Sequence, residues 1–204
     1  GDFRQNAGEI HVYFSDGTLN GTVDFRFPGL RTVAVYGASS DDIFGIKHAS
    51  VDSDHDGLLD LMVGAFYADE ASKADAGKLY ILPGRLLTDM LNASDLVLDL
   101  ASPLPPTVTT ITGPHTKSRL GVWMDGGDVN GDGFDDVVVG ADMADGRDPA
   151  FKETGRVYVY YGPLTPGLHI DASDTTAAMT IIYGIDPGDH AGSCLAVDDV
   201  DGDG

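Results

Sequence analysis

Short apolar runs recur along the chain, most of them next to a glycine. They are rich in β-branched and aromatic residues, show no helical period, and are separated by Gly-, Asp- and Pro-rich stretches. This pattern predicts an all-β fold of many short strands. The runs occupy residues 7–13, 33–37, 60–65, 76–82, 109–113, 136–141, 154–160 and 180–184.

The runs belong to a repeat whose markers keep a fixed register. A strand ends at Gly37, Gly113 and Gly184, and a second glycine follows eight residues later in each copy. Seven residues beyond that glycine, an acidic loop opens at Asp52, Asp128 and Asp199. Successive copies are 76 and then 71 residues apart for every marker, which is the signature of a repeat architecture.

Each unit holds about four short strands, and a single sheet of this size cannot bury both of its faces. Neighbouring units must therefore stack, and a unit of this length suits one four-stranded blade of a β-propeller. The second unit is longer by seven residues around positions 85–106, where residues 86–91 predict a short helix in a surface insertion.

The acidic loops carry the strongest chemical signal. In two complete copies, oxygen-bearing side chains stand at positions 1, 3, 5 and 9, glycine stands at position 6, and the carbonyl of position 7 completes the set. Oxygen ligands in a flexible loop favour Ca²⁺, and glycine permits the sharp turn. The predicted ligands are Asp52, Asp54, Asp56, Leu58 and Asp60; Asp128, Asn130, Asp132, Phe134 and Asp136; and Asp199, Asp201 and Asp203 in a third loop that the sequence leaves incomplete.

Three other readings of these loops fit less well. An EF-hand needs a bidentate Glu at position 12, where this chain has Val63 and Val139, and it needs flanking helices. A dockerin resembles residues 127–133, but it pairs two loops about two dozen residues apart, each followed by a helix. A solvated acidic turn remains the simplest alternative to a metal site.

Together these motifs resemble the FG-GAP repeat of integrin α-subunit propellers and their bacterial relatives. The resemblance runs through Phe44-Gly45, the loop at 52–60, Gly64-Ala65 and the strand at 77–82, and it covers nearly the whole chain. The Phe-Gly pair becomes Leu120-Gly121 and Ala191-Gly192 in the later copies. The resemblance implies a seven-bladed propeller with Ca²⁺ in loops between the first two strands of some blades.

With only about 2.7 units, we expect an open arc of an incomplete propeller. Residues 1–35 would be the last strands of a preceding blade, 36–110 and 111–181 one blade each, and 182–204 a truncated repeat. The first residues contain no signal peptide, and the chain, starting at Gly1 and stopping inside a motif, is expected to be a fragment. The remaining blades are expected partners.

Charge and composition narrow the function. The 33 acidic residues against 12 Lys and Arg give a formal charge of −21, which disfavours nucleic acid and anionic membranes as partners. No apolar run is long enough to insert into a membrane. Weak Ca²⁺ sites fill outside cells, so we expect an extracellular protein, secreted or at the cell surface. The resemblance to integrin α-subunits implies a non-enzymatic, adhesion-like module that binds a protein or glycan.

No residue pattern indicates catalysis by this chain. The one cysteine, Cys194, aligns with Lys47 and Trp123 of the other copies and is expected to be a partly buried strand residue. Trp123 and the tyrosines of the strands (Tyr80, Tyr158, Tyr160 and Tyr161) are expected to pack in the core or between blades rather than stack on sugars. Sequons at Asn20 and Asn92 would be glycosylated only in a eukaryotic secretory route. The alternative function is an accessory propeller of a secreted hydrolase resembling the phospholipase D that cleaves glycosylphosphatidylinositol anchors.

Overall fold

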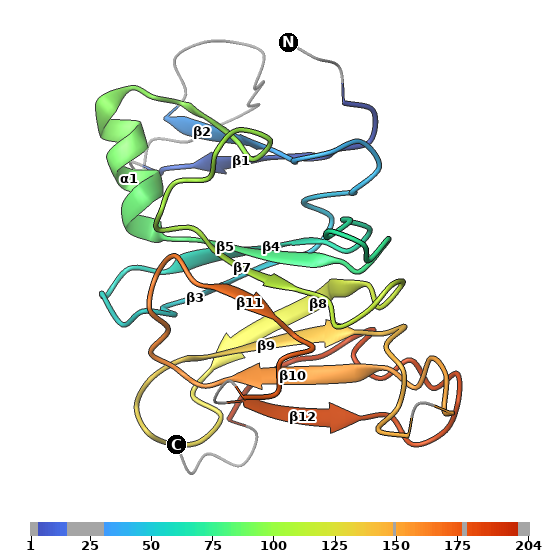
Figure 1. Cartoon of the computed structure of the whole chain (residues 1–204). Coiled ribbons are helices and arrows are strands. Elements are labelled where there is room, and N and C mark those ends of the chain that lie inside the picture. Colours follow the sequence, from blue (N-terminus) through green and yellow to red (C-terminus); the bar gives the residue numbers. More distant parts are fainter. Residues whose placement is uncertain (1–3, 16–30, 149, 177–178, 200–204) are drawn as a thin grey trace.

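A computed structural model describes residues 4–15, 31–148, 150–176 and 179–199. Three β-sheets lie face to face in a stack, with the N-terminal sheet at one end and the C-terminal sheet at the other (Figure 1). The elements are β1 (Glu9–Tyr13), β2 (Thr32–Tyr36), β3 (His48–Val51), β4 (Asp60–Ala65), β5 (Lys78–Leu82), α1 (Gly84–Ala93), β6 (Val97–Asp99), β7 (Thr109–Thr112), β8 (Leu120–Gly127), β9 (Asp136–Ala141), β10 (Arg156–Tyr160), β11 (His169–Asp171) and β12 (Met179–Tyr183).

Each of the two complete sheets is built on an antiparallel meander of four strands. The second sheet contains β3, β4, β5 and β7, and the third contains β8, β9, β10 and β12. Among the residues that the structure describes, the sheets do not close into a ring, which agrees with the partial β-propeller that the repeat predicts. No helix among the described residues is long and apolar enough to cross a membrane.

The apolar runs form the strands that their composition predicts. All eight runs contain a strand, and the helix predicted at 86–91 is α1. The unit divisions expected after residues 35, 110 and 181 fall within β2, β7 and β12, and the positions of the blade boundaries stay a prediction.

The middle sheet is buried on both faces, because alternate residues of its strands point to opposite neighbours. Met62 belongs to the core shared with the third sheet, whereas Val63 and Ala65 belong to the core shared with the first. Gly64 lies between them, where an added Cβ would stand 2.0 Å from the carbonyl oxygen of Gly121 in the next sheet. This close approach explains why the apolar run needs a glycine.

A backbone hydrogen bond joins each unit to the one before it. The amide of Leu120 donates to the carbonyl of Ala76 at 2.9 Å, and the amide of Phe44 donates to Ala7 at the same distance. Ala191 repeats the contact with Thr154. Since the bond uses only main-chain atoms, the Phe position of the motif can change to Leu or Ala without losing it.

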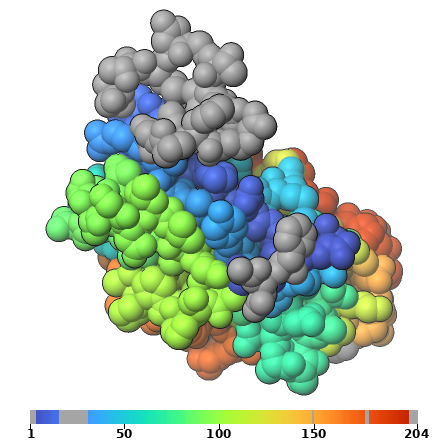
Figure 2. Space-filling model, turned by 90° about the horizontal axis from the view of Figure 1, so that it is seen from above, coloured from blue at the N-terminus to red at the C-terminus, as the bar shows by residue number. Residues whose placement is uncertain are grey.

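The inserted helix covers the junction of the first two sheets. Leu87 and Met90 of α1 are buried in the same core as Val33 and Val35 of β2. Seen from above, the green segment that includes α1 lies beside the blue strands of the first sheet (Figure 2). The insertion therefore extends an existing core and leaves the repeated strands in register.

Candidate metal centre

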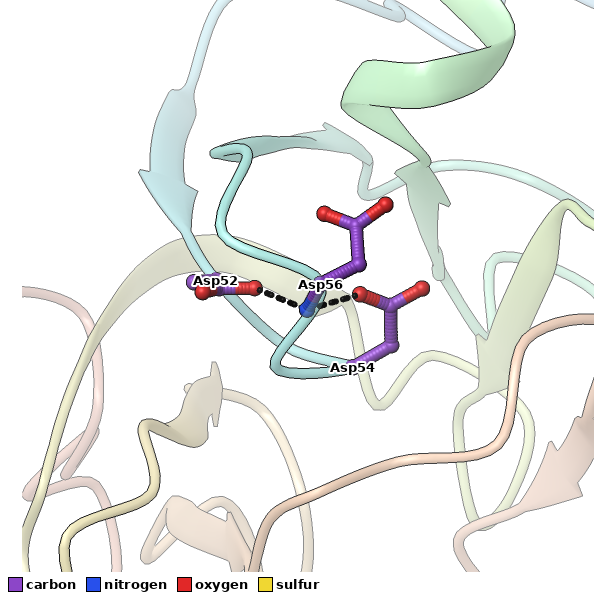
Figure 3. A group of neighbouring side chains, drawn as sticks. All are labelled: Asp52, Asp54 and Asp56. Atoms are coloured by element: carbon purple, nitrogen blue, oxygen red, sulfur yellow. Dashed lines mark hydrogen bonds between the residues drawn. The ribbon is translucent and has the colours of Figure 1, made fainter.

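The first acidic loop brings three carboxylates together between β3 and β4. Asp52, Asp54 and Asp56 each offer one oxygen, and these oxygens lie within 4.8 Å of one another. Figure 3 shows the three side chains around the amide of Asp56, which donates to Asp52 and Asp54 at 3.1 Å each. The loop thus presents a compact set of hard oxygen donors, the type that Ca²⁺ prefers.

The loop folds this way because its backbone makes two left-handed turns. His55, at position 4, has a φ of 60°, and Gly57, at position 6, has a φ of 87°. The second loop has glycine at both places, with φ of 75° at Gly131 and 88° at Gly133. Left-handed φ is accessible to glycine without strain, which accounts for the glycine in the motif.

The second loop, between β8 and β9, repeats the hydrogen bonds of the first. The carboxylate of Asp52 accepts from the amides of Asp56 and Gly57, and the carboxylate of Asp128 accepts from the equivalent amides. The position 5 carboxylate accepts from the position 7 amide in both loops. These bonds are Leu58 to Asp56 at 2.8 Å and Phe134 to Asp132 at 3.0 Å. Two loops with unrelated intervening residues therefore share one conformation.

The side chains at positions 3 and 5 of the second loop are also joined directly. The Asn130 amide nitrogen donates to Asp132 at 2.9 Å, and the Asp132 backbone amide donates to the Asn130 side-chain oxygen at 2.9 Å. The two loops thus differ by one formal charge at position 3, where Asn130 replaces Asp54.

The position 9 aspartates lie outside the carboxylate cluster of the described loops. Asp60 is buried, and its carboxylate accepts from the amide and hydroxyl of Ser53 and from the amide of Gly84. Asp136 is fully buried and accepts from the amides of Val129 and Gly162. Asp60 thereby links the start of its loop to the residue after Pro83 beyond β5, and Asp136 links the start of its loop to the segment beyond β10. Their assignment as metal ligands stays a prediction.

The electrostatics of the loops follow from this arrangement. Burial raises the pKa of Asp54, and the carboxylates of Asp56 and Asp52 raise it further by repulsion. Burial also raises the pKa of Asp60. By contrast, the amide of Gly133 is the main cause of the lowered pKa of Asp128. A divalent cation would relieve the repulsion in the first loop, because it supplies the missing positive charge.

Contacts between the second and third sheets join the two acidic loops. The amide of Asp52 donates to the carboxylate of Asp135 at 3.2 Å, and the ring of His55 meets the ring of Phe134 edge to face at 4.7 Å. The amide of Leu164 donates to the carbonyl of Ser53 at 2.7 Å. Sequence reasoning missed Asp135 and Ser53. The repeat does not indicate a role for Ser53, because the same position of the second loop holds Val129, which has no side-chain hydroxyl.

The third loop is described only at its first residue. Asp199 lines a hollow of about 1040 Å³ on the outer face of the third sheet, together with Val138, Val157 and residues 195–198. The predicted ligands Asp201 and Asp203 lie outside the described residues.

Two further expectations have different outcomes. Cys194 is exposed and lies outside the strands, so its prediction as a partly buried strand residue is wrong. The alignment misled here because the equivalent Trp123 lies in β8, whereas residues 195–199 form no described strand. Tyr80, Tyr158 and Tyr160 are buried, which confirms their packing in the core. Tyr161 instead follows the end of β10 and is only partly buried, and its hydroxyl bonds with that of Thr180.

Of the sequons, Asn92 is exposed in α1, and Asn20 lies outside the described residues.

Comparison with known proteins agrees with the repeat. A family model described as the FG-GAP repeat matches residues 120–160. Integrin alpha-PS2 of Drosophila melanogaster is 34% identical over 141 residues, which is 65% of this chain and 9% of that protein. Integrin alpha-3 of Cricetulus griseus is 31% identical over 119 residues, 58% of this chain and 9% of that protein.

A phospholipase is also similar to part of this chain. Phosphatidylinositol-glycan-specific phospholipase D of Rattus norvegicus is 36% identical over 100 residues, which is 49% of this chain and 11% of that protein. The chain therefore spans about a tenth of the length of the relatives that it matches.

Proposed function

We propose that this chain, which matches the FG-GAP repeat model at residues 120–160 and is similar to integrin α-subunits, is a non-enzymatic, calcium-stabilised propeller module that binds an extracellular protein or glycan in an adhesion-like role. The observation that carries the calcium part is the duplication of one loop conformation and one hydrogen-bond network in two units. Repetition of the ligand spacing in the second unit supports a cation site over a solvated acidic turn.

Calcium would act mainly on stability. Without a cation, three carboxylates of the first loop crowd one another at the junction of two sheets. A cation present at ten times its dissociation constant adds about 1.4 kcal/mol per site to the free energy of unfolding. Extracellular modules bind Ca²⁺ with dissociation constants of about 0.1–1 mM, so such sites fill outside cells and stay empty in cytosol. This argument supports a secreted or cell-surface location.

We place the recognition surface at the opposite end of the strands from the calcium loops. There, the loops before β3 and after β4 enclose a hollow of about 490 Å³ whose walls include Asp41, Asp42, Asp69 and Asp75 together with Tyr67. Such walls complement a partner with basic side chains.

A bead-adhesion assay tests the proposal. Beads coated with the chain should bind a subset of purified matrix glycoproteins in about 1 mM Ca²⁺ and release them in chelator. Asp41→Asn with Asp69→Asn should weaken adhesion without changing the calcium dependence of the melting temperature. Adhesion to none of the glycoproteins would contradict the adhesive role.

The similarity to the phospholipase favours one alternative, an accessory propeller of a secreted hydrolase. In that case the full-length parent would release glycosylphosphatidylinositol-anchored proteins from membranes, and the chain by itself would not. The assay on the parent protein separates the two functions.

A further inference from the structure

The outermost strand of two sheets comes from the following unit. β6 pairs in parallel with β2 of the first sheet, and β11 pairs in parallel with β7 of the second. The register is the same in both cases, with Leu98 opposite Val35 and Ile170 opposite Ile111. Each added strand therefore has an apolar central residue.

Equivalent backbone hydrogen bonds hold both added strands. The amide of Ala34 donates to the carbonyl of Leu96 at 2.9 Å, and the amide of Thr110 donates to that of Leu168 at 2.9 Å. At the other end, the carbonyls of Tyr36 and Thr112 accept from the residue after the added strand. The acceptor strand thus turns outward the backbone groups of two residues, Ala34 and Tyr36 in β2 and Thr110 and Thr112 in β7.

An ion pair completes each contact. Asp99 ends β6 and lies 2.7 Å from the guanidinium of Arg4, and Asp171 ends β11 and lies 2.7 Å from the ammonium group of Lys73. Arg4 and Lys73 occupy one position of the repeat, four residues before Gly8 and Gly77. The strand and its cation recur together.

The third sheet has the acceptor strand but a different residue at the cation position. Within the described ranges, β12 pairs only with β10, and Ile182 is 53% exposed. Four residues before Gly155 stands Phe151, which is 47% exposed. Its carbonyl accepts from the amide of Gly146 at 2.7 Å, as the carbonyl of Lys73 accepts from the amide of Glu70, so the two positions share one backbone contact.

We propose that the outer edge of β12 accepts a parallel strand from the next FG-GAP unit, with an apolar residue opposite Ile182 and a second apolar residue, in place of Asp, opposite Tyr183. The amide of Ile181 and the carbonyl of Tyr183 take the places of the outward groups of β2 and β7. Unpaired strand edges of this kind are templates for strand addition.

The residue at the cation position decides which strand fits. An apolar side chain opposite Tyr183 would cover the exposed ring of Phe151, whereas a carboxylate there would find no cation at the position that Arg4 and Lys73 occupy in the other two sheets. The proposal makes this position a determinant of blade order, since two edges select Asp and the third rejects it. It goes beyond the proposed function and does not depend on calcium, so either idea can fail without the other.

The test uses the full chain, labelled with ¹⁵N, and two peptides. One peptide has the sequence of residues 166–174, and the other carries the change Asp171→Leu. The Leu peptide should shift the amide resonances of Ile181, Ile182 and Tyr183 and slow the hydrogen exchange of Ile181. It should bind about three to five times more tightly than the Asp peptide, the ratio expected if the Leu side chain and the Phe151 ring together remove about 25–40 Å² of apolar surface from water.

The variant Phe151→Lys should reverse this preference, because it restores the cation of the second sheet. Unchanged exchange at Ala34 and Thr110 would show that the variant keeps its fold. If neither peptide at about 10 mM shifts these resonances, strand addition at β12 is contradicted. If the unchanged chain binds the Asp peptide as well as or better than the Leu peptide, the assigned role of Phe151 is wrong.

Discussion

The ammonium nitrogen of Lys73 lies 2.7 Å from the carboxylate of Asp171, although 98 residues separate them in the chain. Lys73 belongs to the loop after β4, and Asp171 ends β11, which departs from the third unit to pair with β7. The contact therefore links two units at the outer edge of the second sheet.

The Lys73–Asp171 pair should contribute little on its own. Both side chains are partly exposed, 24% and 46%, so solvent screens their attraction. A double-mutant cycle of Lys73→Met and Asp171→Asn should give a coupling energy of about 0.5–1 kcal/mol in urea unfolding. The exposed Arg85–Asp89 pair of α1 is a matched control and should give about 0.3 kcal/mol. Equal coupling energies in the two pairs would show that the Lys73–Asp171 contact holds β11 no more strongly than an ordinary surface ion pair.

Two glycines with a left-handed backbone, Gly77 and Gly188, should differ in how much stability is lost when each is replaced by alanine, because their neighbours differ. Gly77 has a φ of 81°, and an added Cβ would lie 2.3 Å from two backbone atoms of Leu120. Gly188 has a similar φ of 83° with nothing within 4 Å. We expect Gly188→Ala to cost about 1–2 kcal/mol of unfolding free energy through its conformation alone, and Gly77→Ala to cost at least twice as much. Similar losses in thermal or urea unfolding would show that close packing of units is not what requires Gly77.

Asp42 should make the chain less stable as the pH rises. Burial raises the pKa of Asp42 from 3.8 to about 6, so the folded state favours the neutral acid. Asp42 ionises at a lower pH in the unfolded chain than in the folded one. Its contribution to the free energy of unfolding is therefore fully present below about pH 4 and is lost as the pH rises from about 4 to 6. Asp42→Asn keeps an acceptor for the amide of Ser39 and should therefore be the more stable protein at pH 7 by about 1–3 kcal/mol.

The comparison of the two proteins isolates Asp42 from the other carboxylates, because those titrate in both. Urea unfolding at pH 4.5 and pH 7 should show a gap that widens with pH. A gap that stays constant would mean that Asp42 ionises in the folded chain as it does in the unfolded one.

The repeat made most of the fold predictable. Residues 60–65 and 136–141 are apolar on both faces and end at the close approaches of Gly64 and Gly140, so their composition reports burial between two sheets. The strands β6 and β11 were not predicted, because each has three residues and depends on an edge supplied by another unit. Local sequence carries no sign of that edge.

The candidate site was predictable only where its geometry depends on the local sequence. Oxygen-bearing residues at alternate positions report the turn that gathers Asp52, Asp54 and Asp56. The same spacing does not distinguish a ligand from a carboxylate that holds backbone amides, as Asp60 does with Gly84. That distinction arises from contacts with chain far beyond the loop.

The most direct test of the central claim, structural calcium, is a thermal melt of the metal-stripped chain titrated separately with Ca²⁺ and Mg²⁺. Millimolar Ca²⁺ should raise the melting temperature by several degrees, Mg²⁺ should change it little, and Asp56→Ala with Asp132→Ala should abolish the rise. Lys152, which pairs with Asp145 away from the loops, supplies a control in Lys152→Met that should keep the full response. A folded chain whose melting temperature ignores Ca²⁺ would show that the loops are acidic turns, and the extracellular assignment would lose its support.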